Sequence, residues 1–133
     1  MKSAPELTSS SCVATYLRPR FGRRMRLQEC FVVIPLDARN KPLRKPILVA
    51  IGSAASVDVH PRDVFRDAVK TNAVSIIIAH NHPSGVIEPS FDDISLTERI
   101  RKGGELLGIK VHDHLILTSN KSVYYSFAEH GYL

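Results

Sequence analysis

Residues 74–79, with the sequence VSIIIA, constrain the fold of this chain more than any other segment. A short run of β-branched residues that is apolar at almost every position is typical of a strand with both faces covered. Such a strand needs neighbouring strands on its two edges and further layers above and below. We therefore expect a layered structure with residues 74–79 at the centre of a sheet.

The remaining segments alternate between strand-like and helix-like patterns. Further strands are predicted at residues 30–36, 46–51, 111–118 and 122–125, and helices at 61–72 and 90–108. Pro35 suggests an edge position or a bulge in the first of these strands. Because short turns join the first two strands and the last two, both antiparallel and parallel pairs are expected. The fold class predicted is α/β, a single domain with a mixed β-sheet flanked by helices.

The N-terminal residues 1–11, MKSAPELTSSS, are polar and offer nothing to bury, so a frayed leader is expected there. Ser11 is predicted to cap a short helix from Cys12 to Leu17 that ends at Pro19. The chain then divides into a leader with a short helix at 1–17 and a domain at 18–133. Because no signal-peptide core or membrane-length apolar run is present, a cytoplasmic protein without a membrane partner is expected.

The loop after the central strand, HNHPSG at residues 80–85, carries the first chemical signal. In extended backbone, His80 and His82 project from one face while Asn81 points away from it. The Pro-Ser-Gly turn reverses the chain, so the start of the next helix can return to the two imidazoles. Asp93 follows Ser90 there by three residues, and this spacing is also typical of a helix-capping arrangement with no chemical role.

Together, two histidines and one aspartate provide three protein ligands of N, N and O type. Catalytic zinc sites have this number of protein ligands, because the fourth position stays open for water. A zinc ion held in this way lowers the pKa of its water to about 7 and polarises a substrate carbonyl. The pattern thus predicts Zn²⁺ at His80, His82 and Asp93, but it does not include a base for proton transfer.

The pattern His-x-His, seven residues, Ser, two residues, Asp, with an upstream Glu that opens a strand, resembles the JAMM motif of JAB/MPN metalloproteases. The segments HNHPSG, PSxxD, LLGIKVHDHLI and SFAEHGYL are similar to the bacterial RadC-like branch of that family. The resemblance runs from about Glu29 to Leu133. It implies the JAB/MPN fold, which is related to the cytidine-deaminase fold, although this chain lacks the metal motif of zinc deaminases.

The resemblance also assigns roles to residues. His80, His82 and Asp93 would be the zinc ligands, and Glu29 would be the general base that later protonates the leaving amine. Ser90 would hydrogen-bond the oxyanion of the tetrahedral intermediate. The implied function is a zinc-dependent metallohydrolase that cleaves a peptide or isopeptide bond of a protein or peptide substrate, which the sequence does not identify. Relatives that keep the fold without chemistry typically lack the ligands, all of which are present here.

A second His-x-His pattern, His112 and His114, has the same alternation and admits a second metal or a further ligand. We favour Asp113 or His114 as a partner of a ligating histidine, because such an imidazole usually donates its other N–H to a neighbouring group.

The net charge of +5 is concentrated in residues 18–46. This segment has two acidic residues, Glu29 and Asp37, and nine basic residues: Arg18, Arg20, Arg23, Arg24, Arg26, Arg39, Lys41, Arg44 and Lys45. A nucleic-acid-associated, DNA-repair-type module that uses Arg18–Lys45 is the alternative function, although the segment has no aromatic interleaving for base stacking. The helix-hairpin-helix-like region of full-length RadC proteins is not expected within these 133 residues. The basic segment could instead steer an acidic partner toward the zinc site. The oligomeric state stays open.

Overall fold

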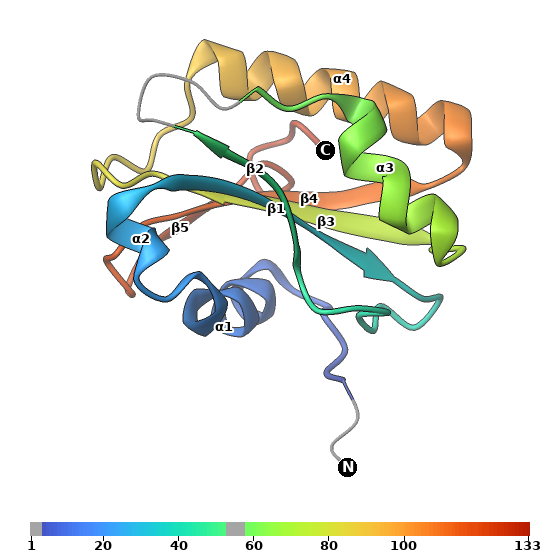
Figure 1. Ribbon diagram of the computed structural model, residues 1–133, viewed down its shortest axis with the longest axis horizontal. Helices are drawn as coiled ribbons and strands as arrows, with labels where there is room; N and C mark the ends of the chain where they lie inside the picture. The colour runs from blue at the N-terminus through green and yellow to red at the C-terminus, as the bar shows by residue number, and fades with distance from the viewer. Residues whose placement is uncertain (1–3, 53–57) are drawn as a thin grey trace.

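Five strands form one sheet at the centre of the molecule, and helices cover both of its faces (Figure 1). The computed structural model describes residues 4–52 and 58–133. Its helices are α1 (Ser10–Phe21), α2 (Arg24–Leu27), α3 (Pro61–Lys70) and α4 (Phe91–Leu107). Its strands are β1 (Glu29–Leu36), β2 (Ile47–Gly52), β3 (Ser75–Asn81), β4 (Lys110–Leu117) and β5 (Tyr124–Ser126). Among the described residues, no helix combines the length and the apolar character that a membrane span requires.

The sheet has the strand order β2-β1-β3-β4-β5, with β3 in the middle and all seven of its residues buried. Strand β1 is antiparallel to β2 and β3, β3 is parallel to β4, and β5 is antiparallel to β4. The predicted mixed sheet and its central strand are therefore confirmed. The ends of the elements predicted from residue 30 onward differ from the observed ends by at most two residues.

The two faces of the sheet bury different side chains. Val32 and Ile77 belong to the core on the side of α1, whereas Val33 and Ile78 belong to the core under α3 and α4. Figure 1 shows α1 and α2 on one side of the sheet and α3 and α4 on the other. Because successive residues of a strand point to opposite faces, one continuously apolar strand supplies both cores.

The N-terminal part of the described chain differs from the prediction. Helix α1 begins at Ser10, with Ser9 as its cap, and it continues through Pro19 to Phe21, so the expected cap at Ser11 and end at Pro19 were wrong. Leu7, expected to lie in a frayed leader, is 4% exposed and belongs to the same core as the sheet. Burial of one side of α1 against the sheet compensates for the hydrogen bond that Pro19 removes. Residues 1–3 of the expected leader lie outside the described residues.

Pro35 lies neither on an edge strand nor at the irregularity in the pairing of β1 with β2. Strand β1 lies between β2 and β3, and the irregularity in its pairing with β2 falls between Phe31 and Val32. The carbonyl of Pro35 accepts a hydrogen bond from the N–H of Leu43, beyond the end of the β1–β2 ladder. The proline nitrogen therefore faces a side where no β2 residue requires a donor.

Candidate metal centre

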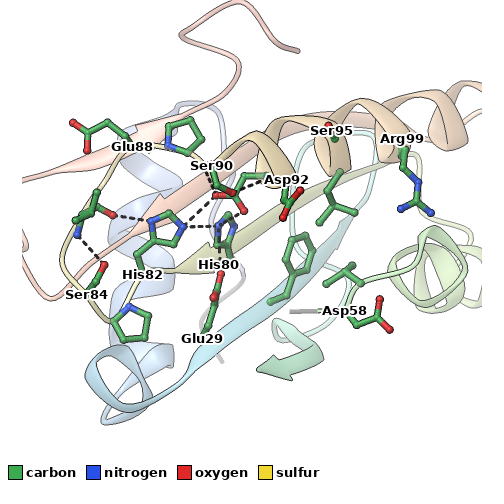
Figure 2. A pocket seen from close by; sticks show the side chains of 17 residues that line it. Glu29, Asp58, His80, His82, Ser84, Glu88, Ser90, Asp92, Ser95 and Arg99 are labelled. Atoms are coloured by element: carbon green, nitrogen blue, oxygen red, sulfur yellow. Dashed lines mark hydrogen bonds and ion pairs between the residues drawn. The ribbon is translucent and has the colours of Figure 1, made fainter. Parts of the chain in front are cut away.

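Four side chains, from β1, β3, α4 and the segment after β3, meet at one end of the sheet (Figure 2). Glu29 opens β1, His80 lies near the end of β3, His82 follows that strand, and Asp93 lies in the first turn of α4. Because β1 and β3 are antiparallel, with Phe31 opposite His80, the start of β1 lies beside the end of β3. One ligand atom from each residue lies within 4.8 Å of the others. The structure thus brings together the three predicted ligands and the predicted base, hereafter the metal-site cluster.

The distances within the metal-site cluster separate three inner groups from one outer group. The Asp93 carboxylate lies 3.3 Å from Nε2 of His80 and 3.3 Å from Nε2 of His82. The two Nε2 atoms lie 3.0 Å apart, whereas the Glu29 carboxylate lies 3.9 Å from Nε2 of His80. Two imidazoles and a carboxylate are a donor set that zinc accepts, and other first-row divalent metals accept it as well. The residues present therefore fit a metal ion with Glu29 beside it.

The two carboxyl groups of the metal-site cluster are perturbed in opposite directions. Burial raises the pKa of Glu29, against the opposing effect of His80 and His82. Burial alone would also raise the pKa of Asp93, but hydrogen bonds from the two histidines outweigh it and hold that pKa well below its ordinary value. Asp93 therefore stays anionic, as a ligand must, while Glu29 exchanges a proton closer to neutral pH than an ordinary glutamate.

Ser90 and Asp93 form the capping box that their spacing predicted. The Ser90 hydroxyl accepts a hydrogen bond from the N–H of Asp93 at 3.0 Å, and the Asp93 carboxylate accepts one from the N–H of Ser90 at 2.9 Å. The capping role is thus confirmed without excluding the chemical one. Ser90 lines the cleft, and its hydroxyl proton has no acceptor among the described residues. The oxyanion role of Ser90 stays a prediction.

His114 contacts the metal-site cluster from behind. Its Nε2 lies 2.7 Å from Nδ1 of His80, which confirms one of the two partners predicted for a ligating histidine. Asp113, the other candidate, instead accepts hydrogen bonds from Ser10 and Ser126. The pairing of β3 with β4 skips His112, so His112 and His114 do not alternate as they would in a regular strand. His112 lies outside the metal-site cluster.

Two residues that the sequence analysis did not assign to the site support it. Thr97, one turn after Asp93 on α4, lies 2.6 Å from Nδ1 of His114. Asn81 points away from the histidines, as predicted, and is completely buried. Its side chain accepts from the N–H of Cys30 and donates to the carbonyl of Gln28, so it bonds the backbone on both sides of Glu29. An amide at the end of a buried strand was the available signal, because a buried amide needs partners.

A cleft of about 680 Å³ opens over the metal-site cluster. Asp58, Glu88 and Asp92 lie on its wall with one basic residue, Arg99 (Figure 2). None of the nine basic residues in 18–46 lines this cleft. Three of them, Arg20, Arg24 and Lys45, line a separate cavity of about 240 Å³ between α1, α2 and the β1–β2 pair. The structure therefore gives no support to the expectation that this segment steers an acidic partner into the cleft.

A five-stranded mixed sheet, with one histidine at the end of its central strand and a second just after it, both facing a glutamate and an aspartate, defines an α/β domain with a candidate metal site. The family model of the RadC-like JAB domain matches residues 7–132, and the chain belongs to this family. The resemblance found in the sequence motifs is thus confirmed.

Curated relatives agree with this assignment. A UPF0758 protein of Rubrobacter xylanophilus is 40% identical over 129 residues, which cover 97% of this chain and 54% of the relative. A UPF0758 protein of Carboxydothermus hydrogenoformans is 47% identical over 111 residues, 84% of this chain and 48% of the relative. One of Methanosarcina mazei is 38% identical over 128 residues, 96% of this chain and 54% of the relative. The chain spans about half the length of these relatives.

Proposed function

We propose that this protein is a zinc-dependent hydrolase that cleaves a peptide or isopeptide bond of a protein or peptide substrate. The arrangement of the metal-site cluster carries the proposal: three inner groups of the donor type that zinc accepts, with the Glu29 carboxylate 3.9 Å from Nε2 of His80. Membership of the RadC-like JAB family supports the same class of chemistry. A cytoplasmic location stays a prediction.

The residues divide the work of hydrolysis among them. When bound, zinc supplies a water molecule of lowered pKa and polarises the scissile carbonyl. Glu29 accepts the proton of the attacking water and returns it to the leaving amine, and its raised pKa suits both transfers. The free hydroxyl proton of Ser90 is donated to the carbonyl oxygen as negative charge develops there. The carboxylate of Asp93 and the Nε2 atoms of His80 and His82 hold the metal in place.

The test combines metal analysis with a cleavage screen. Purified protein, stripped by chelation and reloaded with zinc, is incubated with fluorogenic peptides and with peptides branched through a lysine ε-amine. We expect about one zinc per chain, its loss in His80→Ala, and zinc-dependent cleavage. Glu29→Gln is the matched control, because the amide keeps the size of the side chain but removes the base. It should retain zinc and have no turnover, and turnover equal to wild type would sink the assignment.

Nucleic-acid binding by residues 18–46 is a second candidate function. Of the nine basic residues, only Arg39 has an ion pair within the described chain, with Glu6, so most of the positive charge is not neutralised by neighbours. Arg18 is a poor choice for mutation, because its guanidinium donates to the carbonyls of Thr118, Asn120 and Val123. Binding of an oligonucleotide that weakens steeply with salt and is lost when Arg20, Arg23, Arg24 and Arg26 are replaced by Ala would support it. Binding unaffected by those changes would remove it.

A further inference from the structure

A chain of hydrogen bonds runs from the backbone of Asp93 to the ring of His80. The Thr97 hydroxyl lies 2.7 Å from the carbonyl oxygen of Asp93 and 2.6 Å from Nδ1 of His114. Nε2 of His114 lies 2.7 Å from Nδ1 of His80. The chain thus connects two residues of the metal-site cluster through two residues that lie outside it.

The position of each proton along this chain follows from the chemistry of the end groups. A carbonyl oxygen only accepts, so the single hydroxyl proton of Thr97 is donated to Asp93. The Thr97 oxygen must then accept from Nδ1–H of His114. His114 is completely buried and forms no ion pair with a carboxylate of the described residues, and an unpaired buried charge is costly, so the ring carries one proton. With that proton on Nδ1, Nε2 of His114 accepts from Nδ1–H of His80.

The reverse direction of donation along this chain of hydrogen bonds is disfavoured. If Thr97 donated to His114, two oxygen atoms 2.7 Å apart would face each other without a proton between them. His114 would then donate from Nε2 to Nδ1 of His80, which would place the proton of His80 on Nε2, the atom that faces Asp93. Nε2 of His80 would then have no lone pair for a metal.

Aromatic packing holds both rings of the chain in place. Phe31 stacks on His80 with ring centroids 5.8 Å apart and planes inclined by 11°. Phe127 stacks on His114 at 4.4 Å and 12°. The two imidazoles therefore have little freedom to exchange partners by rotation.

We infer that Thr97 and His114 are positioning residues that hold a proton on Nδ1 of His80 and so leave Nε2 as the ring nitrogen available to a metal at the metal-site cluster. His82 does not depend on them, because its Nδ1 lies 2.7 Å from the carbonyl oxygen of Val86, which can only accept. The inference rests on the metal site of the proposed function but not on hydrolysis.

The first experiment needs no variant. Long-range ¹H–¹⁵N correlation spectra of the imidazoles in metal-free protein report which ring nitrogens carry protons. We expect Nδ1–H for His80, His82 and His114. A proton on Nε2 of His114, or a His80 ring without a proton on Nδ1, would overturn the inference.

The second experiment uses Thr97→Val, which keeps the shape of the side chain but removes the hydroxyl, with Thr97→Ser as its matched control. Without its acceptor, the proton of His114 should move to Nε2, and that of His80 should also move to Nε2, while His82 stays unchanged. Zinc affinity, measured against a chromophoric chelator, should fall about 10- to 100-fold in Thr97→Val and stay near wild type in Thr97→Ser. Unchanged protons and unchanged affinity in folded Thr97→Val would contradict the inference.

These results separate the inference from the proposed function. A protein with the expected ring protons that binds zinc but cleaves no peptide would retain the positioning roles and overturn the hydrolase. A protein that cleaves peptides while His114 carries its proton on Nε2 would retain the hydrolase and overturn the positioning roles.

Discussion

The side-chain oxygen of Asn81 accepts a hydrogen bond from the backbone N–H of Cys30 at 2.7 Å. The amide nitrogen of the same side chain donates to the carbonyls of Gln28 at 2.8 Å and Met25 at 3.0 Å. One residue between two candidate ligands thus holds the segment that carries Glu29. The two faces of the HNH sequence serve one site, because the histidines are candidate metal ligands and the asparagine holds the backbone on both sides of Glu29.

Replacing Asn81 with Ala should destabilise the protein strongly. The change leaves a buried N–H and two carbonyls without partners, and we expect the free energy of unfolding to fall by about 2–4 kcal/mol. Urea denaturation of metal-free protein measures it. Asn120→Ala, at an exposed turn where the amide oxygen accepts from the N–H of Ser122, is the matched control and should cost less than about 1 kcal/mol. Equal costs for the two variants would contradict a special role for Asn81.

Replacing Ser90 with Ala should separate capping from catalysis. Loss of the cap is expected to lower the free energy of unfolding by about 1 kcal/mol, which leaves the protein folded. If the hydroxyl also stabilises the oxyanion, turnover of the zinc-loaded protein should fall about 10²- to 10³-fold. Ser90→Thr keeps the hydroxyl and should retain both properties. If turnover in Ser90→Ala falls only as much as the loss of folded protein accounts for, Ser90 acts as a helix cap alone.

The metal affinity should fall as the pH is lowered. The fall should begin at a pH above the usual pKa of a histidine side chain. Burial alone would lower the pKa of His82, but hydrogen bonds with Asp93 and the Val86 carbonyl outweigh it and raise the pKa above 6.5. Because a protonated imidazole cannot bind metal, protons compete as the pH falls through this raised value.

The contribution of His82 to the stability of the metal-free protein should change in the opposite direction, and comparing wild type with His82→Gln separates it from the opposing contribution of buried His114. A raised folded-state pKa means that protonated His82 contributes stability at low pH, which is lost as the pH rises through that pKa. Zinc competition titrations and urea denaturation between about pH 5 and pH 8 measure the two trends. A metal affinity that is constant over this range would refute the prediction.

Two adjacent glycines of α4 should respond differently to alanine. A β-carbon on Gly104 would overlap the carbonyl oxygen of Ile109, whereas on Gly103 its nearest neighbour is the Phe65 ring at 3.3 Å. Gly104→Ala should therefore destabilise the protein by about 3 kcal/mol or more, because backbone must move. Gly103→Ala should lie within about 1 kcal/mol of wild type, since helix propensity offsets the tight contact. Thermal unfolding measures both, and a Gly104→Ala protein as stable as wild type would contradict the close packing of α4 on β4.

Local sequence patterns predicted the features that depend only on residues close to one another in the sequence. Alternation along the strand placed His80 and His82 on one face and Asn81 on the other. The spacing of Ser90 and Asp93 predicted the capping box that holds this carboxylate at the start of α4. These features follow from strand and helix periodicity, which depends only on local backbone geometry.

Contacts between distant segments were predicted less well. Helix α1 was expected to end at Pro19, because the low helix propensity of proline is a local signal. The burial of Leu17 and Phe21 against the sheet depends on residues far away in the sequence, and no local signal shows it. The sequence left Asp113 and His114 open as partners of a histidine, and the choice of His114 depends on the register of β4 against β3, which no sequence pattern displayed.

The sequence by itself determined the central strand, the mixed sheet and the four members of the metal-site cluster, the fourth of which, Glu29, was predicted only by resemblance to a family. Only the tertiary structure showed that Asn81 lies behind Glu29 and Thr97 behind His114, and it decided between the two predicted partners of His80 in favour of His114. The reason is physical. A residue's face on a strand or helix depends on local periodicity, whereas its hydrogen-bond partner depends on strand register and helix packing, which the whole fold determines.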